Sequence, residues 1–192
     1  HCIPAAQLVP RGEVRAMPAK LAPMQAETGE AAFNHADWMW EPKLDGYRLL
    51  AFISAHGVTL RSRNGLDLTR AFPRVVDELG KQSVDWMVLD GEIVAFAAPG
   101  KPAFNALQNR VQLKTEREIA VAEQGTPVIF YAFDLLYFAG IDLRGARYCD
   151  RRRYLAQCLL PSLLVQLVHA SADGIALNEA ALASGFEGVI GK

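Results

Sequence analysis

The sequence of 192 residues predicts an α+β domain with mainly antiparallel sheets. Three observations lead to this fold class. Segments with a strand pattern follow other strands as often as they follow helices, whereas a doubly wound parallel sheet needs regular alternation. Neither G-x-G-x-x-G nor G-x-x-x-x-G-K followed by Ser or Thr occurs, so a Rossmann site and a P-loop are excluded. Apolar residues form 51% of the chain, which suffices for a sizeable core at this length.

Strands are expected where β-branched and aromatic residues run together between turn residues. The pair His56-Gly57 is turn-like and joins the first two strands into a hairpin. Gly91 lies inside the third strand. The strands are expected over 47–54, 58–60, 85–96, 128–138, 163–169 and 188–190.

Helices are expected where apolar residues recur at helical spacing between capping and ending residues. Thr69 is expected to cap a helix that ends at Gly80, because four apolar residues between them fall at i, i+3, i+4 and i+7. Asp150 is expected to cap a helix that includes Tyr154 and Leu155. The other helices are expected over 104–111, 114–124 and 178–184.

Residues 1–24 are rich in Pro, Ala and polar residues and show no clear period, so we interpret them as a leader or linker before a domain over 25–192. Residues 8–12 read L-V-P-R-G, which resembles a protease-site scar from an expression vector, although chance explains it equally well. No signal peptide is evident, and no apolar run reaches the roughly eighteen residues of a membrane helix.

Charge and cysteines limit the function classes. With 20 basic and 21 acidic residues the net charge is −1, so any affinity for DNA must come from local clusters such as Arg61 with Arg63, or 151–153. The three cysteines form no C-x-x-C pair, which excludes a zinc knuckle and a dithiol redox site. Their wide spacing fits the reduced thiols of a cytosolic protein.

Five short polar motifs follow one another between residue 41 and the last residue, 192. Each is short, and K-x-D-G alone is weak evidence, but the ordered set covers most of the chain. The motifs are E-P-K-L-D-G-Y-R at 41–48, R-S-R-N-G at 61–65, L-D-G-E at 89–92, F-D at 133–134 and E-G-V-I at 187–190.

This ordered set resembles the motifs of the covalent nucleotidyltransferases, which include ATP-dependent DNA ligases, RNA ligases and mRNA capping enzymes. It is most similar to bacterial DNA ligases, especially the ligase module of the end-joining enzyme ligase D. The resemblance implies an ATP-grasp-like α+β fold with antiparallel sheets and flanking helices around a nucleotide cleft. It also implies three steps: a lysine takes AMP from ATP, AMP passes to the 5′-phosphate of DNA, and the 3′-hydroxyl displaces AMP to seal the strand.

Lys43 corresponds to the lysine that becomes bonded to AMP. A lysine amine can attack the α-phosphate of ATP and form a phosphoramidate. It must be neutral to do so, whereas a free lysine titrates near about 10.4, so nearby cations, a metal ion and burial are expected to favour the neutral amine. Gly46 is expected to let the backbone approach the nucleotide closely. The alternative is a surface lysine paired with Glu41 or Asp45.

The resemblance implies roles for five further residues. Glu41 corresponds to the residue beside the adenine edge, and Arg48 to the arginine that binds the ribose. Arg63 corresponds to the arginine that meets the phosphate of the DNA end, or else is an exposed arginine in a turn. Glu92 corresponds to a carboxylate for the ribose or a metal ion. Phe133 corresponds to the aromatic plate under the adenine, with a plain core phenylalanine as the alternative.

Two C-terminal residues complete the expected site. Glu187 corresponds to a second metal-binding carboxylate, and Lys192 to a lysine that contacts the nucleotide's phosphates. Mg²⁺ (or Mn²⁺) needs only one or two carboxylates beside phosphates and waters. Family members continue into a K-x-K motif and an OB-fold domain, so we expect the chain to be a fragment of reduced activity.

The resemblance also implies the setting of the enzyme. The expected partners are nicked or broken DNA, the protein Ku and fused polymerase and phosphoesterase modules. The expected role is DNA repair and recombination by non-homologous end joining, in the cytoplasm at the bacterial nucleoid. The alternatives are an RNA ligase or capping-type enzyme, and a nucleotide-binding fragment without ligase activity.

Overall fold

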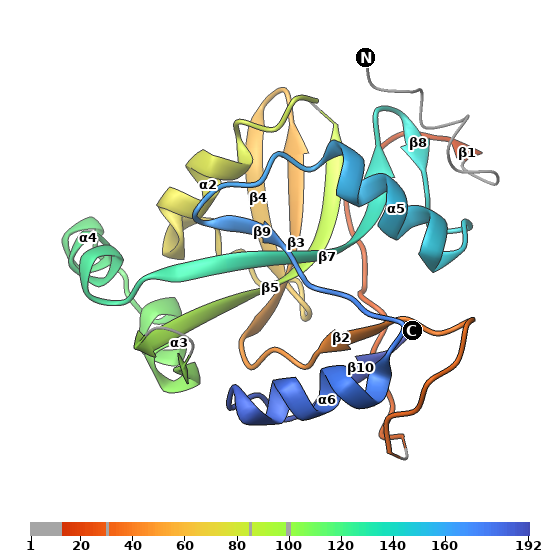
Figure 1. Cartoon of the computed structure of the whole chain (residues 1–192). Coiled ribbons are helices and arrows are strands. Elements are labelled where there is room, and N and C mark those ends of the chain that lie inside the picture. Colours follow the sequence, from red (N-terminus) through yellow and green to blue (C-terminus); the bar gives the residue numbers. More distant parts are fainter. Residues whose placement is uncertain (1–12, 30, 85, 99–100) are drawn as a thin grey trace.

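The computed structural model describes residues 13–29, 31–84, 86–98 and 101–192. Figure 1 shows the elements, coloured by their order in the chain, around a strongly twisted sheet. The strands are β1 (Glu13–Val14), β2 (Trp40–Pro42), β3 (Tyr47–Ser54), β4 (Gly57–Ser62), β5 (Met87–Ala98), β6 (Lys101–Pro102), β7 (Val128–Phe138), β8 (Ile141–Asp142), β9 (Val165–Leu167) and β10 (Val189–Gly191). The helices are a 3₁₀ turn η1 (Thr69–Ala71), α2 (Pro73–Leu79), α3 (Phe104–Val111), α4 (Glu116–Gly125), α5 (Tyr148–Cys158) and α6 (Gly174–Ala183).

The described strands form two sheets. The large sheet has the order β1-β8-β7-β5-β3-β4, with β6 added to β5 and β9 added to β7. Its pairs are antiparallel except β7 with β9. The small sheet is the antiparallel pair β2 and β10. The mainly antiparallel α+β class is therefore confirmed.

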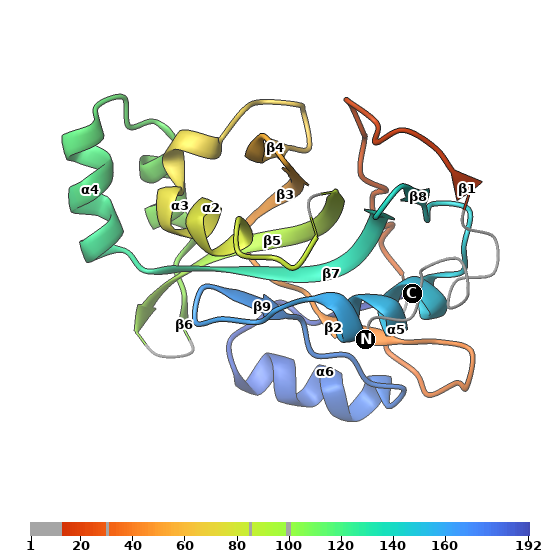
Figure 2. The same ribbon diagram turned by 90° about the horizontal axis from the view of Figure 1, so that it is seen from above.

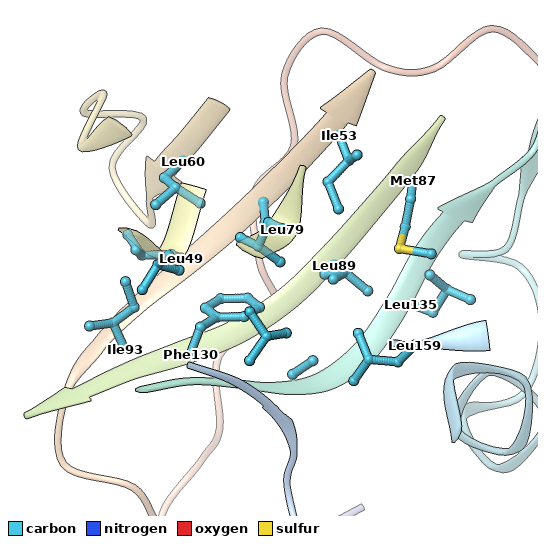
Figure 3. Packing of buried hydrophobic residues seen from close by; sticks show 14 of the residues in the cluster. Leu49, Ile53, Leu60, Leu79, Met87, Leu89, Ile93, Phe130, Leu135 and Leu159 are labelled. Atoms are coloured by element: carbon cyan, nitrogen blue, oxygen red, sulfur yellow. The ribbon is translucent and has the colours of Figure 1, made fainter. Parts of the chain in front are cut away.

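Strict alternation along β3 gives the large sheet two unlike faces. Leu49, Ala51 and Ile53 point into the main core together with residues of β5, β7, α2 and α5. Figure 3 shows this core between the long strands and α2. The other residues of β3 point the opposite way: Leu50 and Phe52 join a small apolar cluster, while Arg48 continues the same face as a polar position. This second face is therefore apolar at one end and polar at the other.

Gly91 lets β5 pack closely against β7 and the ring of Phe130. A Cβ atom at this position would lie 2.4 Å from Cζ of Phe130 and 2.6 Å from the carbonyl oxygen of Tyr131. The pairing of β5 with β7 also shifts register between Asp90 and Gly91. The glycine of the D-G-E motif thus serves packing, and the bulge beside it sets how the polar residues of β5 and β7 face each other.

The small sheet lies across the polar end of the large one. In Figure 2, β2 and α6 lie on one side of β5 and β7, whereas α2, α3 and α4 lie on the other. Trp40 of β2 is buried, stacks on Trp38 with 6.0 Å between ring centroids, and meets Phe33 edge-on at 5.0 Å. These aromatic contacts hold the strand that precedes Lys43 in place.

Residues of the segment predicted to be a leader contact the large sheet. β1 pairs with β8, and Met17 and Leu21 pack against the small apolar cluster of Leu50 and Phe52. Residues 8–12, the proposed protease-site scar, lie outside the described residues. The boundary at residue 24 stays a prediction.

Most predicted elements are confirmed, with corrections at helix starts. Thr69 does not cap α2: it begins η1, its Oγ1 accepts from the Leu60 amide at 3.0 Å, and Pro73 opens the helix. Asp150 lies in the first turn of α5, which Arg147 precedes, so it is not the cap. A further correction concerns α6, which begins at residue 174.

Candidate active site

Lys43 follows β2 and is held by the small sheet. Its amide donates to the carbonyl of Gly188 at 2.8 Å, and its Nζ contacts Oε2 of Glu187. The Lys43 side chain is 51% exposed, so the amine remains accessible to a nucleotide. The register of β2 against β10, with Pro42 opposite Val189, therefore joins the first and last sequence motifs.

A second cluster lies on the same two strands, around Glu41. This carboxylate is 3% exposed; the hydroxyl of Tyr148 donates to its Oε1, and Nζ of Lys192 lies 2.5 Å from its Oε2. The same ammonium lies 4.2 Å from the ring centroid of Phe133 and 4.9 Å from that of Tyr148. The structure places Lys192 beside Glu41 and Phe133, and its expected contact with the phosphates of the nucleotide stays a prediction.

Arg48 is bound by a carboxylate of the neighbouring strand. Its Nε and Nη2 donate to the two oxygens of Asp90 at 3.0 and 2.7 Å, and its Nη1 donates to the carbonyl of Met24. Its guanidinium also lies 5.2 Å from the Phe133 ring centroid. Burial raises the pKa of Asp90, against the opposing effect of Arg48. The two-pronged geometry nevertheless favours a charged pair.

Asp90 faces a second carboxylate, which is half-buried, across the strands. Asp134 is its partner in the β5–β7 register, and Arg151 of α5 binds Asp134 with distances of 2.8 and 2.7 Å. Two arginine forks thus neutralise two carboxylates that would otherwise repel each other. Arg48 is fixed in this way beneath the polar end of the sheet.

Glu92 lies beside the lysine loop, where a Cβ atom on Gly46 would be 3.0 Å from its Cγ. Burial raises its pKa to about 8; Asp90 and Asp45 act in the same sense, while Arg48 and the Gly46 amide act against them. A Cβ atom on Gly46 would lie 2.1 Å from the Ile93 carbonyl oxygen. The absence of a side chain at Gly46 therefore lets the loop that carries Lys43 pack closely against β5.

Arg63 is not brought into this group. It is exposed in the turn after β4, where the Gly65 amide donates to the Ser62 carbonyl at 2.8 Å. The described residues of the site form no hydrogen bond or ion pair with it. This placement leaves Arg63 free to meet a ligand that approaches from solvent, and its role stays a prediction.

Three residues of the site were missed or assigned differently by sequence reasoning. Tyr148 lies more than a hundred residues from Glu41 and belongs to no motif, so no local signal pointed to it. The basic cluster at 151–153 was considered for DNA, which is wrong for its first two members. Arg151 and Arg152 are 9% and 7% exposed and face Asp134 and Glu41.

The two carboxylates expected at a metal ion are Glu92 on β5 and Glu187 just before β10, and the metal site stays a prediction. Among the described residues, no three His, Cys, Asp or Glu side chains cluster as a ready-made metal site. Mg²⁺ keeps several waters and uses few protein carboxylates when phosphates are present. Glu187 is exposed beside Lys43. Burial raises the pKa of Glu92, and a nearby cation would act against this effect and favour the ionised carboxylate.

The fold is that of a nucleotidyltransferase domain. The family model described as ATP dependent DNA ligase domain matches residues 17–192. The chain therefore belongs to the ATP-dependent DNA ligase domain family.

Its relatives include end-joining ligases. The LigD protein of Mycobacterium tuberculosis, named a multifunctional non-homologous end joining DNA repair protein, is 38% identical over 176 residues, which are 90% of this chain and 21% of that protein. DNA ligase C1 of Mycolicibacterium smegmatis is 34% identical over 161 residues, which are 81% of this chain and 46% of that protein. The chain thus spans about a fifth of LigD and under half of ligase C1.

Two solved structures of DNA ligases are similar to the fold of this chain. The ligase domain of M. tuberculosis LigD superposes with a TM-score of 0.70 at 36% identity, covering 90% of this chain and 53% of that one. A mycobacterial DNA ligase D complexed with ATP and MES gives a TM-score of 0.67 at 35% identity, covering 90% and 54%. The described part of the chain contains no helix long and apolar enough to cross a membrane.

Proposed function

We propose that Lys43 is the nucleophile that takes AMP from ATP in an ATP-dependent DNA ligase. The observation that supports this most is the contact of Nζ with Glu187 at the edge of a site whose other residues suit a nucleoside. In the step, the nitrogen lone pair forms a bond to the α-phosphorus. The bond from that phosphorus to the bridging oxygen breaks, pyrophosphate leaves, and the nitrogen loses its proton.

Glu187 has a direct influence on that amine. Its carboxylate contacts Nζ directly, and an amine held by this carboxylate is not free to approach the α-phosphorus. We therefore infer that the carboxylate of Glu187 turns to other cations when MgATP binds, which releases the amine. Glu187 and Glu92 would hold the ion, and Mg²⁺ would supply neutralisation of the phosphate charge.

The remaining residues would orient the nucleoside. Phe133 offers a ring face for the adenine, and Glu41 offers an acceptor for its edge. Arg48, fixed by Asp90, lies beside the same ring, where it would meet the ribose. Most of the rate enhancement would come from positioning and charge neutralisation.

Intact mass spectrometry tests the lysine. After incubation with ATP and Mg²⁺ the protein should gain the mass of one AMP, and acid should remove it. Lys43→Ala should abolish the gain. Lys81→Ala is the matched control, because Lys81 is also an exposed lysine in an ion pair, with Glu78 at 2.6 Å. An adduct that persists in Lys43→Ala, or that never forms in the unchanged chain, would contradict the proposal.

Transfer of AMP to DNA is proposed from the relatives' names and the family. Nick sealing measured with matched DNA and RNA strands separates a DNA ligase from an RNA ligase, and no feature of the site favours a capping enzyme. Arg63 would meet the 5′-phosphate of the break. Ku, fused polymerase and phosphoesterase modules, and a place at the nucleoid stay predictions.

A further inference from the structure

We propose that Tyr148 is a positioning residue that holds Glu41 as the acceptor for the 6-amino group of adenine, and that it thereby sets the preference for 6-aminopurine nucleotides. The inference rests on the proposed function, because it concerns the nucleotide of that site. It assigns a role to a residue outside every sequence motif.

The geometry around Glu41 supports the inference. The Tyr148 hydroxyl donates to Oε1, and Lys192 binds Oε2 at 2.5 Å. The Lys192 ammonium also touches the rings of both Phe133 and Tyr148, at 4.2 and 4.9 Å from their centroids. The carboxylate is therefore gripped at both oxygens, beside the ring on which the base would lie.

The Glu41 carboxylate favours a base that donates a hydrogen bond to it. An ionised carboxylate only accepts hydrogen bonds and has about four acceptor positions, so Tyr148 and Lys192 leave some of them free. The 6-amino group of adenine is a donor, whereas guanine presents a carbonyl oxygen there. Burial raises the pKa of Tyr148, so its hydroxyl keeps its proton and remains a donor across the working pH range.

Tyr148 can act as a fixed support because α5 is anchored. It is the first residue of α5. Arg151 ties that helix to Asp134, and Leu155 of the same helix is fully buried in the main core. Glu41 lies on β2, in the other sheet. The hydroxyl thus fixes a side chain of the small sheet from a helix packed on the large one.

Calorimetric titration with two nucleotides tests the role. The probes are ATP and purine riboside triphosphate, which lacks the 6-amino group. The unchanged chain should bind ATP on the order of tenfold more tightly than the amine-free analogue. Tyr148→Phe should weaken ATP binding by about that factor, change binding of the analogue less than about twofold, and so erase the preference.

Two controls separate positioning from general damage. Tyr137→Phe also deletes a buried tyrosine hydroxyl, which donates to the Arg15 carbonyl at 2.8 Å outside the site, and should leave both affinities unchanged. In a Glu41→Ala background, Tyr148→Phe should have no further effect on ATP binding, because the group it acts through is gone.

The outcomes are distinct. Loss of ATP preference in Tyr148→Phe alone supports the inference. Equal weakening of both nucleotides, no weakening, or an undiminished effect in the Glu41→Ala background overturns it while the proposed function stands. Failure of the unchanged chain to bind ATP contradicts the proposed function, and the inference falls with it.

Discussion

Replacement of Glu92 by glutamine is expected to remove a large pH dependence of folding. Burial raises the pKa of this carboxyl from 4.5 to about 8 in the folded state. Below pH 4.5 both the folded and the unfolded chain hold the proton. Between these values the unfolded chain releases the proton and the folded chain keeps it, so the free energy of unfolding falls as pH rises. Above about pH 8 the loss is complete.

The size of the effect follows from those two pKa values. For a single group, the linkage relation gives a cost of about 2 kcal/mol at pH 6 and about 5 kcal/mol at pH 9. The unchanged protein should therefore lose roughly 2–3 kcal/mol relative to Glu92→Gln between these conditions. Taking the difference between the two proteins cancels the titration of groups that they share.

Urea unfolding at several pH values from 6 to 9 measures this difference. Glu179→Gln is the control, because Glu179 is an exposed carboxylate on α6 and should give a flat difference. A flat difference for Glu92→Gln as well would refute the reasoning, since it would mean that Glu92 is already ionised at neutral pH in the folded chain.

Two further substitutions probe the arginine pairs. Arg110→Ala should lower the free energy of unfolding by about 3 kcal/mol or more in urea titrations, because it strands the charge of Glu123, its buried partner; a loss below about 1 kcal/mol would show that the pair adds little. Asp90→Asn should weaken ATP binding on the order of tenfold in calorimetric titration, because a neutral amide cannot grip both prongs of Arg48. Asp142→Asn breaks a similar fork outside the site and should leave the affinity unchanged; equal affinities in both variants would rule out a role for the Asp90 fork.

Strands were predicted well where one residue pattern decides them. The run over 128–138 matches β7 at both ends, because it is long and rich in β-branched and aromatic residues. Helix starts were predicted poorly, because capping depends on which side chain reaches the first turn. At α6 the side chain of Asp173 accepts from the Ala176 amide at 3.0 Å, and no apolar period marked that start.

The site was predicted as a set of residues, but its contacts were not. The motifs supplied Lys43 and Glu187, which the register of β2 and β10 brings together. They did not show that Arg48 pairs with Asp90, because that choice depends on how a long side chain crosses between strands. Tyr148 could not be predicted either, because its contact with Glu41 joins elements that are distant in sequence.

The division of the site between two sheets has a mechanical consequence. Lys43 and its partner Glu187 are held by the small sheet. The residues proposed to bind the ribose and the base lie largely on the long strands of the large sheet. Along the chain, a short linker from β2 to β3 joins the two sheets, and the segment through α6 joins β9 to β10. Because Glu41 stands on the same sheet as Lys43, a tilt of that sheet would move the amine and the proposed adenine acceptor together, so reactivity would be coupled to recognition of the base.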